Sequence, residues 1–424
     1  MPIKIITKLV RTFFVGRKQK FVFTRRDSVV FSKPEKLDIY IHIPFCKNMC
    51  PYCPYNRIVY DVSLVKPYLD ALLEEIRQYR LKFGKIEIGS IYIGGGTPTN
   101  MIDEIETLLD DIRNKFIVAG DICMETSPSD ITVDIVRKLK NMGISLLSIG
   151  IQSFNDEHLK TLGRKYSAAI AEEALKLAVG ANFKSVNVDL MFVLPGQSKS
   201  DVLLDIDKAI NLGADQITTY PLFTFPYTSI GKHLKLNKLK MPNLFARRDM
   251  YREIHNHCER KGYNRVSVWG FKNGRGSRYS SVTRENYIGI GAGACSRLES
   301  IFYFNTFSVK EYISVAKQGK FPMALAMDIT PKLGSFYWLY WRFYDTEISK
   351  NELWNRFVRI DAKLVVLFAI LKSLGLCRDE GSSYVLTERG AFYIHLIQNY
   401  FILNYINRVW TIAQKDAWPE RICI

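Results

Sequence analysis

The sequence lacks the features expected of a secreted or membrane-spanning protein. We expect no secretory signal, because the apolar runs near the start are short and interrupted by basic residues. The longest run without a charged residue, residues 391–407, is shorter than a bilayer requires and contains polar side chains, so it predicts a buried or docking helix. Only eight cysteines occur in 424 residues, and five of them are scattered. This usage indicates a reducing, cytoplasmic environment rather than a disulfide framework.

Acidic residues are also scarce relative to basic ones, 42 against 59, which gives a formal net charge of +17. The first 26 residues contain no acid at all, and their basic residues are interleaved with Ile, Leu, Val and Phe. Such a segment could lie on an anionic membrane surface, touch nucleic acid, or pack on the domain as a basic arm. We favour the packed arm, keep a peripheral membrane contact through residues 1–26 as an alternative, and expect no nucleic-acid partner. An anionic, carboxylate-bearing substrate would also suit a basic protein.

Strand-like and helix-like stretches alternate from residue 36 to about residue 225. The expected strands are Leu37–Ile43, Ile86–Ile93, Asp121–Glu125, Leu146–Ile151, Ser185–Phe192 and Asp215–Leu222. The expected helices are Leu64–Phe83, Ile102–Lys115, Ile131–Met142, Ala168–Val179 and Asp201–Leu212. This alternation predicts an α/β fold built from βαβ units around a parallel sheet. Six units favour a partial (β/α)6 barrel of the TIM type, with chemistry at the C-terminal ends of the strands.

Three of the cysteines lie together, directly after the first expected strand. Pro44 ends that strand, and Cys46, Cys50 and Cys53 follow with the spacing C-x3-C-x2-C. Three thiolates so close together favour a metal centre over a disulfide, with a zinc site or a buried trio as the alternatives. A cubane iron–sulfur cluster usually takes four thiolates, so three would leave one iron open to another ligand.

Polar or glycine residues follow four further expected strands. Because the C-terminal ends of parallel strands meet at one end of a barrel, we expect these residues to lie close together. A run of glycines lets backbone amides approach a ligand, and carboxylates favour such nests of amides. The groups concerned are Gly94-Gly95-Gly96-Thr97-Pro98-Thr99, Glu125, Gln152 with the later Arg164, and Asn187 with Asp189.

Three stretches together resemble those of radical S-adenosylmethionine enzymes. They are Tyr40-x-His42-Ile43-Pro44-Phe45-Cys46-x3-Cys50-x-Tyr52-Cys53, Gly94-Gly95-Gly96-Thr97-Pro98 and Ile149-Gly150-Ile151-Gln152-Ser153-Phe154. Within that superfamily the chain is most similar to the oxygen-independent coproporphyrinogen III oxidase family, which also includes the heme chaperones and related methyltransferases. The likeness runs from about Leu37 to Ser296 and resumes near Leu386.

The resemblance implies a cofactor site at the mouth of the barrel. Cys46, Cys50 and Cys53 would hold a [4Fe–4S] cluster whose open iron binds S-adenosylmethionine, as one or two molecules. One electron, delivered by a flavodoxin- or ferredoxin-type donor, would then cleave the sulfonium and release a 5′-deoxyadenosyl radical, and no further catalytic residue is assigned. The residues implied to contact the cofactor are Gly95, Gly96 and Thr97 at the methionine end, Glu125, Gln152, Arg164 and Asp189 at the carboxylate and ribose, and Tyr40 and Tyr52 beside it.

The chain departs from its family at two positions that bear on the reaction. The coproporphyrinogen oxidases proper carry a further cysteine two residues beyond the trio, where this chain has Tyr55. The heme chaperones carry a His-Asn-x-x-Tyr-Trp motif that is missing before the Gly289–Gly293 turn, which disfavours heme loading by that route. We therefore expect a radical enzyme of porphyrin or heme metabolism acting on a small, tetrapyrrole-like substrate by oxidative decarboxylation, with carbon methylation and heme delivery as alternatives. Cys295 is either a radical-quenching thiol or a structural one.

The sequence as a whole predicts three parts: a basic arm over residues 1–35, the radical core with its extension over 36–300, and a mainly helical, winged-helix-like domain over 301–424. In the last part, Phe357–Leu374 is an expected helix and Thr387 an expected N-cap. We expect this domain to act as a lid or substrate wall and the protein to be a monomer. Cations near Trp269 and Phe271 could meet a flat or carboxylated substrate or form a solvated surface; they are Lys272, Arg275, Arg278 and Arg284.

Overall fold

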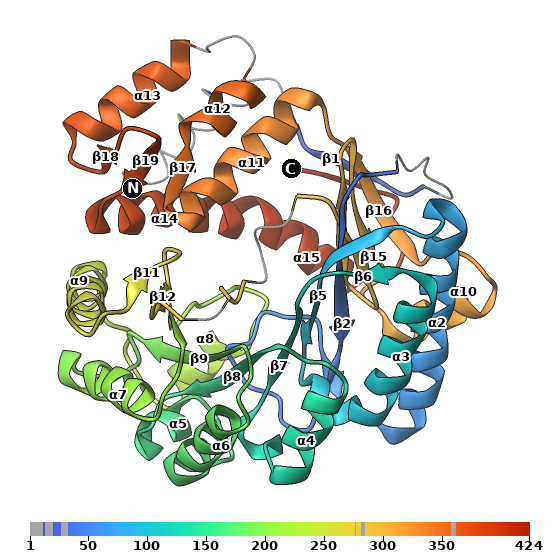
Figure 1. The fold of residues 1–424 in the computed structure, drawn as a ribbon, viewed down its shortest axis with the longest axis horizontal. Coiled ribbons are helices and arrows are strands. Elements are labelled where there is room, and N and C mark those ends of the chain that lie inside the picture. The colour runs from blue at the N-terminus through green and yellow to red at the C-terminus, as the bar shows by residue number, and fades with distance from the viewer. Residues whose placement is uncertain (1–11, 13–19, 27–32, 276, 281–284, 358–361) are drawn as a thin grey trace.

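Six parallel strands form the centre of the molecule. A computed structural model describes residues 12, 20–26, 33–275, 277–280, 285–357 and 362–424 (Figure 1). The order of these strands across the sheet is β10-β9-β8-β7-β5-β2. Their bounds are β2 Leu37–Ile43, β5 Glu87–Gly95, β7 Ile122–Thr126, β8 Leu146–Gln152, β9 Ser185–Phe192 and β10 Gln216–Pro221. All six strands predicted from the sequence are confirmed, and the sheet does not close on itself.

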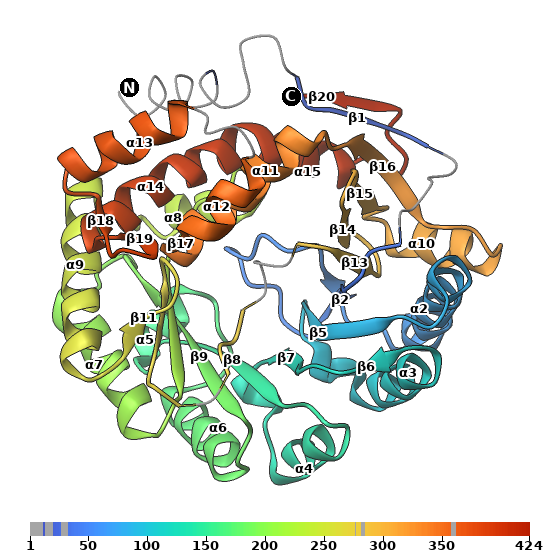
Figure 2. The same ribbon diagram turned by 45° about the horizontal axis from the view of Figure 1, so that its top comes forward.

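Helices cover the outer side of these strands (Figure 2). Seen in that view, α2, α3, α4, α6 and α7 follow one another around the outside of the strands. β9 is covered on both faces, since all but one of its residues are buried, although polar side chains alternate with apolar ones in its first half. The helices are α2 Val62–Phe83, α3 Ile102–Lys115, α4 Val133–Asn141, α5 Asp156–Thr161, α6 Ala168–Gly180 and α7 Lys199–Asn211. The predicted helix at Ile131 begins two residues later, because Thr132 caps it by accepting from the Ile135 amide (3.2 Å).

The sheet continues past β2 through strands that the sequence analysis did not predict. β13 (Tyr287–Ile290) lies parallel to β2, and β14 (Cys295–Leu298), β15 (Ile301–Asn305) and β16 (Met323–Asp328) follow as antiparallel neighbours. β1 (Val22–Thr24) then pairs with both β16 and β20 (Arg421–Cys423). At the opposite edge, β12 (Gly270–Lys272) and β11 (Asn264–Arg265) join β10. The remaining short strands are β3 Phe45–Cys46, β4 Ile58–Val59 and β6 Ile117–Val118.

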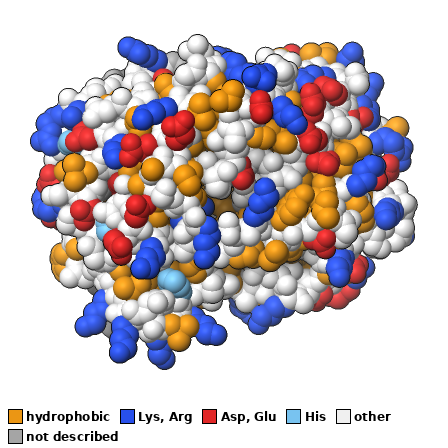
Figure 3. Space-filling model, turned by 90° about the horizontal axis from the view of Figure 1, so that it is seen from below, with side chains coloured by type: hydrophobic (Ala, Val, Ile, Leu, Met, Phe, Trp, Pro, Cys, Tyr) orange, Lys and Arg blue, Asp and Glu red, His pale blue; other side chains and the backbone are white. Residues whose placement is uncertain are grey.

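Part of the basic arm is therefore structured. Arg26 donates to both carboxylate oxygens of Asp328 (2.7 Å each), and Arg25 pairs with Glu420 (3.2 Å). Most of residues 1–26, on which the membrane contact was predicted, lie outside the described residues. Among the residues that are described, no helix is both long enough and apolar enough to cross a bilayer. Basic and acidic side chains are interspersed over most of the face drawn in Figure 3, and one small basic group projects at its lower left.

The C-terminal region is mainly helical and lies across one end of the barrel (Figures 1 and 2). A small antiparallel sheet, in the order β17-β19-β18, packs with its helices in a winged-helix-like arrangement. Thr387 caps α14 by accepting from the Gly390 amide (3.0 Å), as predicted. Phe357 ends α12 rather than beginning the next helix. Its helices and strands are α10 Val309–Lys317, α11 Pro331–Asp345, β17 Glu347–Ser349, α12 Lys350–Arg356, α13 Ala362–Ser373, β18 Cys377–Asp379, β19 Ser383–Leu386, α14 Glu388–Phe401 and α15 Asn407–Ala413. Two helices precede this region, α8 Ile230–Leu236 and α9 Leu244–Arg260.

Candidate cluster and cofactor site

The three clustered cysteines lie on a loop that leaves the C-terminal end of β2. Cys46 ends β3, which pairs in parallel with β4 and so fixes the start and the end of the loop. Between them, the Arg57 guanidinium donates to the main-chain carbonyl of Cys50 (2.5 Å) and lies 3.4 Å from that of Cys53. The Arg57 side chain thus holds two carbonyls of the loop together and helps to fix the positions of the cysteines.

The thiols of this loop are sheltered from water to different degrees. Cys46 and Cys50 are buried, whereas Cys53 is half-buried. Burial raises the pKa of Cys46, and it raises the pKa of Cys53 to about 11, with the nearby Arg57 charge opposing the shift. Bound metal reverses this preference, because a coordinating thiol is deprotonated. Within the described ranges, no three His, Cys, Asp or Glu side chains are placed to hold a metal ion. In a cubane cluster each thiolate binds a different iron, so the thiols need not converge on one point.

A buried histidine supports the loop from behind. The His42 imidazole lies between the Tyr40 hydroxyl (2.8 Å to Nδ1) and the Asn56 main-chain carbonyl (2.7 Å to Nε2). Since the carbonyl can only accept, Nε2 carries the proton and Nδ1 accepts from Tyr40. Burial lowers the pKa of His42 to about 4, so the ring stays neutral. The strand and the far end of the cysteine loop are tied together through this ring.

The glycine run after β5 brings two strand ends into close contact. A side chain at Gly95 would collide with the His42 ring (2.6 Å), and Gly95 has a φ of +115°, which disfavours other residues. A side chain at Gly96 would lie 2.7 Å from the Phe45 carbonyl and 3.0 Å from the Cys46 sulfur. The amides of residues 95–97 donate to Glu125, Ile43 and Phe45, respectively. These glycines thus allow close approach, but their N–H groups already have protein acceptors and do not form the free amide nest that the sequence suggested.

Two carboxylates stand on the strands that flank β8. Glu125, at the end of β7, accepts from the Tyr92 hydroxyl and from the Gly95 amide (3.1 Å). Asp189, on β9, accepts from Ser148 (3.2 Å) and Asn187 (3.0 Å). Burial raises the pKa of both, that of Asp189 to about 7, and the Glu125 charge contributes to the shift of Asp189. Two carboxyls that interact in this way share protons and can accept from or donate to hydroxyl groups of a ligand.

Arg164 and Tyr52 contribute buried polar atoms to the site. The guanidinium of Arg164 lies over the rings of Tyr52 (5.6 Å) and Tyr166 (5.7 Å). Among the described residues, neither its Nε nor the Tyr52 hydroxyl has a well-formed hydrogen bond, although the two side chains interact electrostatically with each other. A side chain at Gly150 would lie 2.9 Å from the Gln152 Nε2 and 3.8 Å from the Arg164 Nη2, so both groups approach that position. Buried donors without acceptors are rare in folded proteins, and these two are therefore candidates to bind a ligand.

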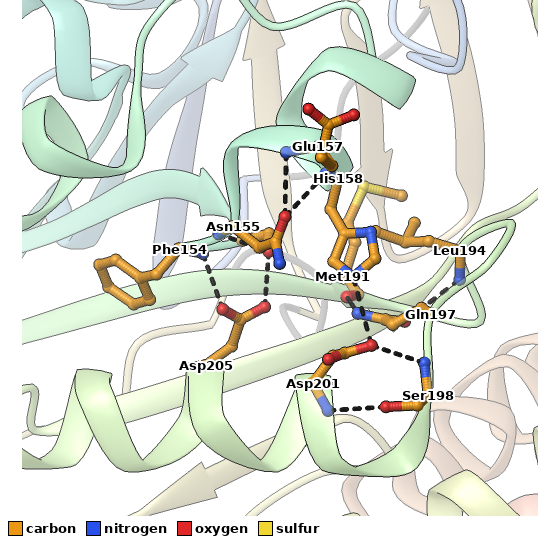
Figure 4. A network of polar contacts seen from close by, with 11 residues as sticks. Phe154, Asn155, Glu157, His158, Met191, Leu194, Gln197, Ser198, Asp201 and Asp205 are labelled. Atoms are coloured by element: carbon orange, nitrogen blue, oxygen red, sulfur yellow. Dashed lines mark hydrogen bonds and ion pairs between the residues drawn. The ribbon is translucent and has the colours of Figure 1, made fainter.

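The loop after β8, which carries Gln152, is fixed by helix α7 (Figure 4). The buried Asp205 carboxylate accepts from the Ser153 hydroxyl (2.7 Å) and the Phe154 amide (2.8 Å). Asn155 then caps α5, the helix that leads to Arg164. On the neighbouring loop, Gln197 accepts from the Leu194 amide (3.2 Å) and donates to the Met191 carbonyl (3.3 Å). Side-chain contacts therefore hold both strand-end loops, and they permit the positive φ of +70° at Gln152.

A cleft of about 820 Å³ opens beside the cysteine loop on its outer side. Met49, Cys53 and Arg57 form one wall, and residues before and within α10 and after α15 form the other. Lys310 and Lys415 line it together with a single acid, Glu311. The half-buried thiol of Cys53 is thus reached through a mainly basic opening.

The structure brings the predicted site residues to one end of the barrel, around the cysteine loop. Sequence reasoning gave no role to His42 or Tyr92 and named Asn187 only among the polar groups of the strands, although His42 lies two residues after Tyr40 and was visible in the same motif. Of the predicted cations, Arg278 pairs with Asp345, Lys272 donates to main-chain carbonyls, and Arg284 lies outside the described residues. Cys295 is half-buried at the start of β14, and burial raises the pKa of its thiol to about 12. Whether Cys295 is a radical-quenching thiol or a structural one therefore remains a hypothesis.

The contents of the site fit a [4Fe–4S] cluster with S-adenosylmethionine. Three thiols on an ordered loop match three ligands of a four-iron cluster. The Arg164 Nε and the Tyr52 hydroxyl suit a carboxylate, and the carboxyls of Glu125 and Asp189 suit an amino group or ribose hydroxyls.

The chain is similar to known proteins along most of its length. The model of the radical SAM superfamily matches residues 40–209. The heme chaperone HemW of Bacillus subtilis is 28% identical over 360 residues, covering 83% of this chain and 95% of that protein. HemW of Escherichia coli is 33% identical over 265 residues, covering 61% of this chain and 69% of that protein. Among solved structures, coproporphyrinogen III oxidase HemN of Escherichia coli superposes with a TM-score of 0.76 at 22% identity, covering 89% of this chain and 94% of that one.

The resemblance stated from the sequence motifs is thus confirmed by the superfamily match, by relatives along most of the chain and by the shared fold. The chain belongs to the radical S-adenosylmethionine superfamily and, within it, to the HemN/HemW-like family.

Proposed function

We propose that this chain cleaves S-adenosylmethionine reductively at a [4Fe–4S] cluster and uses the resulting radical on a tetrapyrrole-like substrate. One observation carries the proposal: donors and acceptors suited to this cofactor meet beside three thiols on an ordered loop. Arg164 and Tyr52 present donors there, while Glu125 and Asp189 present carboxyls. A structural zinc site would not require this second set of groups.

When bound, the cluster would supply one electron to the sulfonium, which yields methionine and a 5′-deoxyadenosyl radical. The chain's own residues would bind and orient. Cys46, Cys50 and Cys53 would hold the cluster, and Arg164 would bind the cofactor carboxylate. Asp189, whose pKa of about 7 lets it carry a proton at neutral pH, would donate to or accept from a ribose hydroxyl near Glu125.

The substrate class is inferred from the side chains around the barrel mouth. Tyr55 is 49% exposed, although it lies close enough to Glu125 and Asp189 for them to contribute, after burial, to its raised pKa. Tyr220 and Tyr344 are half-buried in the same neighbourhood. Partly exposed aromatic rings beside a radical-generating site suit a molecule built of aromatic rings, such as the pyrroles of a porphyrinogen.

The reaction we favour is oxidative decarboxylation of the coproporphyrinogen III oxidase type. Abstraction of a hydrogen atom by the radical would give 5′-deoxyadenosine and a substrate radical, which would lose carbon dioxide and pass one electron to an acceptor. Carbon methylation is the alternative within the same class, and it would yield S-adenosylhomocysteine as well. Because Tyr55 replaces the extra cysteine of the oxidases proper, a second bound S-adenosylmethionine is not part of the proposal.

The experiment is anaerobic turnover of the reconstituted protein with strong reductant, S-adenosylmethionine and candidate porphyrinogens, with all small products identified by mass. Formation of 5′-deoxyadenosine in the intact protein but not in Cys50→Ala supports cleavage. If the intact protein forms none, the enzymatic proposal fails. Release of carbon dioxide or formation of S-adenosylhomocysteine then separates decarboxylation from methylation.

A second candidate function is heme delivery, because the relatives described above are named heme chaperones. The missing His-Asn motif disfavours it. Anaerobic heme titration decides between the two: tight, stoichiometric heme binding without turnover would favour delivery, whereas weak binding with turnover would favour the enzyme.

We also propose that the electron donor is an acidic flavodoxin- or ferredoxin-type protein that docks at the cleft beside Cys53. Arg57, Lys310 and Lys415 give that cleft a net positive lining, which would attract an acidic partner. The eight cysteines are all free thiols, which suits a reducing compartment such as the cytoplasm.

A further inference from the structure

Two buried hydrogen-bond donors between the barrel and the C-terminal region have no acceptor on another described residue. They are Arg247 on α9 and His395 on α14, and neither has a role in the cofactor site. Both contact the ring of Phe223, which follows β10 at the mouth of the barrel. The Arg247 guanidinium lies 5.3 Å above that ring, and the His395 imidazole stacks on it at 6.3 Å with an angle of 20°.

Arg247 is a cation without a counterion. Among the described residues it forms no ion pair, its Nε is buried without a hydrogen bond, and its other close neighbours are the rings of Trp269 (5.8 Å) and Phe392 (6.0 Å). Burial lowers the pKa of Arg247 to about 10, so the side chain remains charged at neutral pH. A buried charge normally has a partner, because the desolvation cost is large. Aromatic faces offset only part of that cost.

Arg248, the next residue on α9, has the ion pair that Arg247 lacks among the described residues. Arg248 donates through both terminal nitrogens to the carboxylate of Glu388 on α14, at 2.7 Å for the Nη2 contact. The chain therefore supplies a carboxylate to one of two adjacent arginines and leaves the other facing aromatic rings.

His395 offers a second donor at the same place. Its Nε2 accepts from the Trp269 indole (3.0 Å), because an indole nitrogen can only donate. The proton of the neutral ring is then on Nδ1, which forms no hydrogen bond to another residue although His395 is only 7% exposed. Burial lowers the pKa of His395 to about 3, with the Arg247 charge adding to the shift, so the ring stays neutral.

Aromatic contacts connect this pair to the radical site. The Tyr344 ring lies 5.8 Å from that of His395. Burial raises the pKa of Tyr344, and the charge of Asp189 adds to the shift, so these two side chains lie near each other. Arg247 and Phe223 each keep part of their surface exposed. A flat ligand on the rings at the barrel mouth could therefore extend from the cofactor to Arg247.

We propose that Arg247 and His395 form a carboxylate-binding subsite for a flat aromatic substrate and fix which edge of it faces the cofactor. Arg247 supplies the charge, the His395 Nδ1–H supplies a second hydrogen bond, and Phe223 supplies a face for the ring. That this subsite binds an anion is inferred from the contacts of Arg247 and His395 alone. That the bound ring belongs to a tetrapyrrole rests on the proposed function.

The test compares two ligands that share one ring. Cluster-reconstituted protein is titrated with coproporphyrin III, which carries four carboxylates, and with its tetramethyl ester, at equal detergent concentration. We expect the intact protein to prefer the acid. Arg247→Gln should weaken binding of the acid about ten- to a hundredfold, the effect of losing a hydrogen bond to a charged group, and leave the ester unchanged. Arg247→Lys should recover part of the loss.

Arg248→Gln is the matched control, because it removes a paired cation from the same helix turn. Equal binding of acid and ester by the intact protein would overturn the subsite. An equal loss of affinity for the acid in R247Q and R248Q would overturn it as well. If the intact protein binds neither porphyrin, the tetrapyrrole assignment fails, and the subsite is decided with 2-naphthoate against neutral 2-naphthamide. Binding of 2-naphthoate that is no tighter than that of the amide, or that is unaffected by R247Q, would reject the subsite too.

Discussion

Replacing Glu75 with glutamine tests how much the polar network beneath the cysteine strand depends on pH. Glu75 lies on α2 and is fully buried. Its carboxyl accepts from the Tyr312 hydroxyl (2.6 Å), the Asn305 amide (2.8 Å) and the Gly291 main chain (3.0 Å). These contacts hold the glycine turn between β13 and β14 against the helix.

The direction of the effect follows from the two pKa values of this carboxyl. Burial raises the pKa of Glu75 from 4.5 to about 7, although its three hydrogen bonds oppose the shift. Between these values the folded state binds more protons than the unfolded state. The stabilisation is therefore fully present below pH 4.5 and is lost as the pH rises through about 7. At about 1.4 kcal/mol per pH unit, a difference of about 2.5 units (about 7 minus 4.5) corresponds to about 3 kcal/mol.

E75Q keeps the shape of the side chain but cannot titrate. Thermal unfolding is measured anaerobically for both proteins from pH 4.5 to 8.5. The Tm of the intact protein minus that of E75Q should fall by about 3 °C over this range, given the unfolding entropy of a chain of this size. Glu74→Gln is the control, because the Arg77 charge lowers the pKa of Glu74 and predicts a small change of opposite sign. A difference between the intact protein and E75Q that does not vary with pH would refute the reasoning.

Three further predictions concern the site itself. Arg164→Gln should weaken S-adenosylmethionine binding at least tenfold, since a hydrogen bond to a charged group is lost; calorimetry showing an unchanged Kd would contradict the assigned role. Asp205→Ala leaves the Phe154 amide and the Ser153 hydroxyl buried without their acceptor. It should cost about 2–5 kcal/mol of stability and raise the KM for the cofactor. The control is Asp201→Ala, which removes a half-buried carboxylate from the N-terminal cap of the same helix, and an equal Tm for the two variants would show that the Asp205 contacts are unimportant. The double change Lys310→Glu with Lys415→Glu should slow reduction by a flavodoxin at low salt at least tenfold and leave dithionite reduction unaffected. If both reductants are slowed alike, the cleft is not the docking site.

The six parallel strands were predictable because each is a short apolar run bounded by polar residues. β9 agrees with its predicted bounds at both ends, and the polar residues within it, Asn187 and Asp189, were identified in advance. The cysteine loop was predictable for a different reason, since its ligands are close together in sequence. In both cases the information is local.

Features that depend on distant contacts were not predictable. β13 to β16 are only four to six residues long, and they become strands because β2 provides an edge for β13. Glu75 looked like any helical acid, and its burial depends on residues more than 200 positions away. Arg247 likewise could not be told from Arg248 in the sequence. Only the position of Glu388 on α14 makes one of them a paired side chain and the other a free one.

The pairing of β1 has a consequence for how the chain is made. Val22 lies opposite Cys423, and Thr24 lies opposite Ala326, so both partners of this early strand are encoded at least 300 residues later. During translation β1 leaves the ribosome long before either partner exists, and an unpaired strand edge invites association with other chains. The basic side chains that flank it would keep nascent chains apart by mutual repulsion until β16 and then β20 arrive.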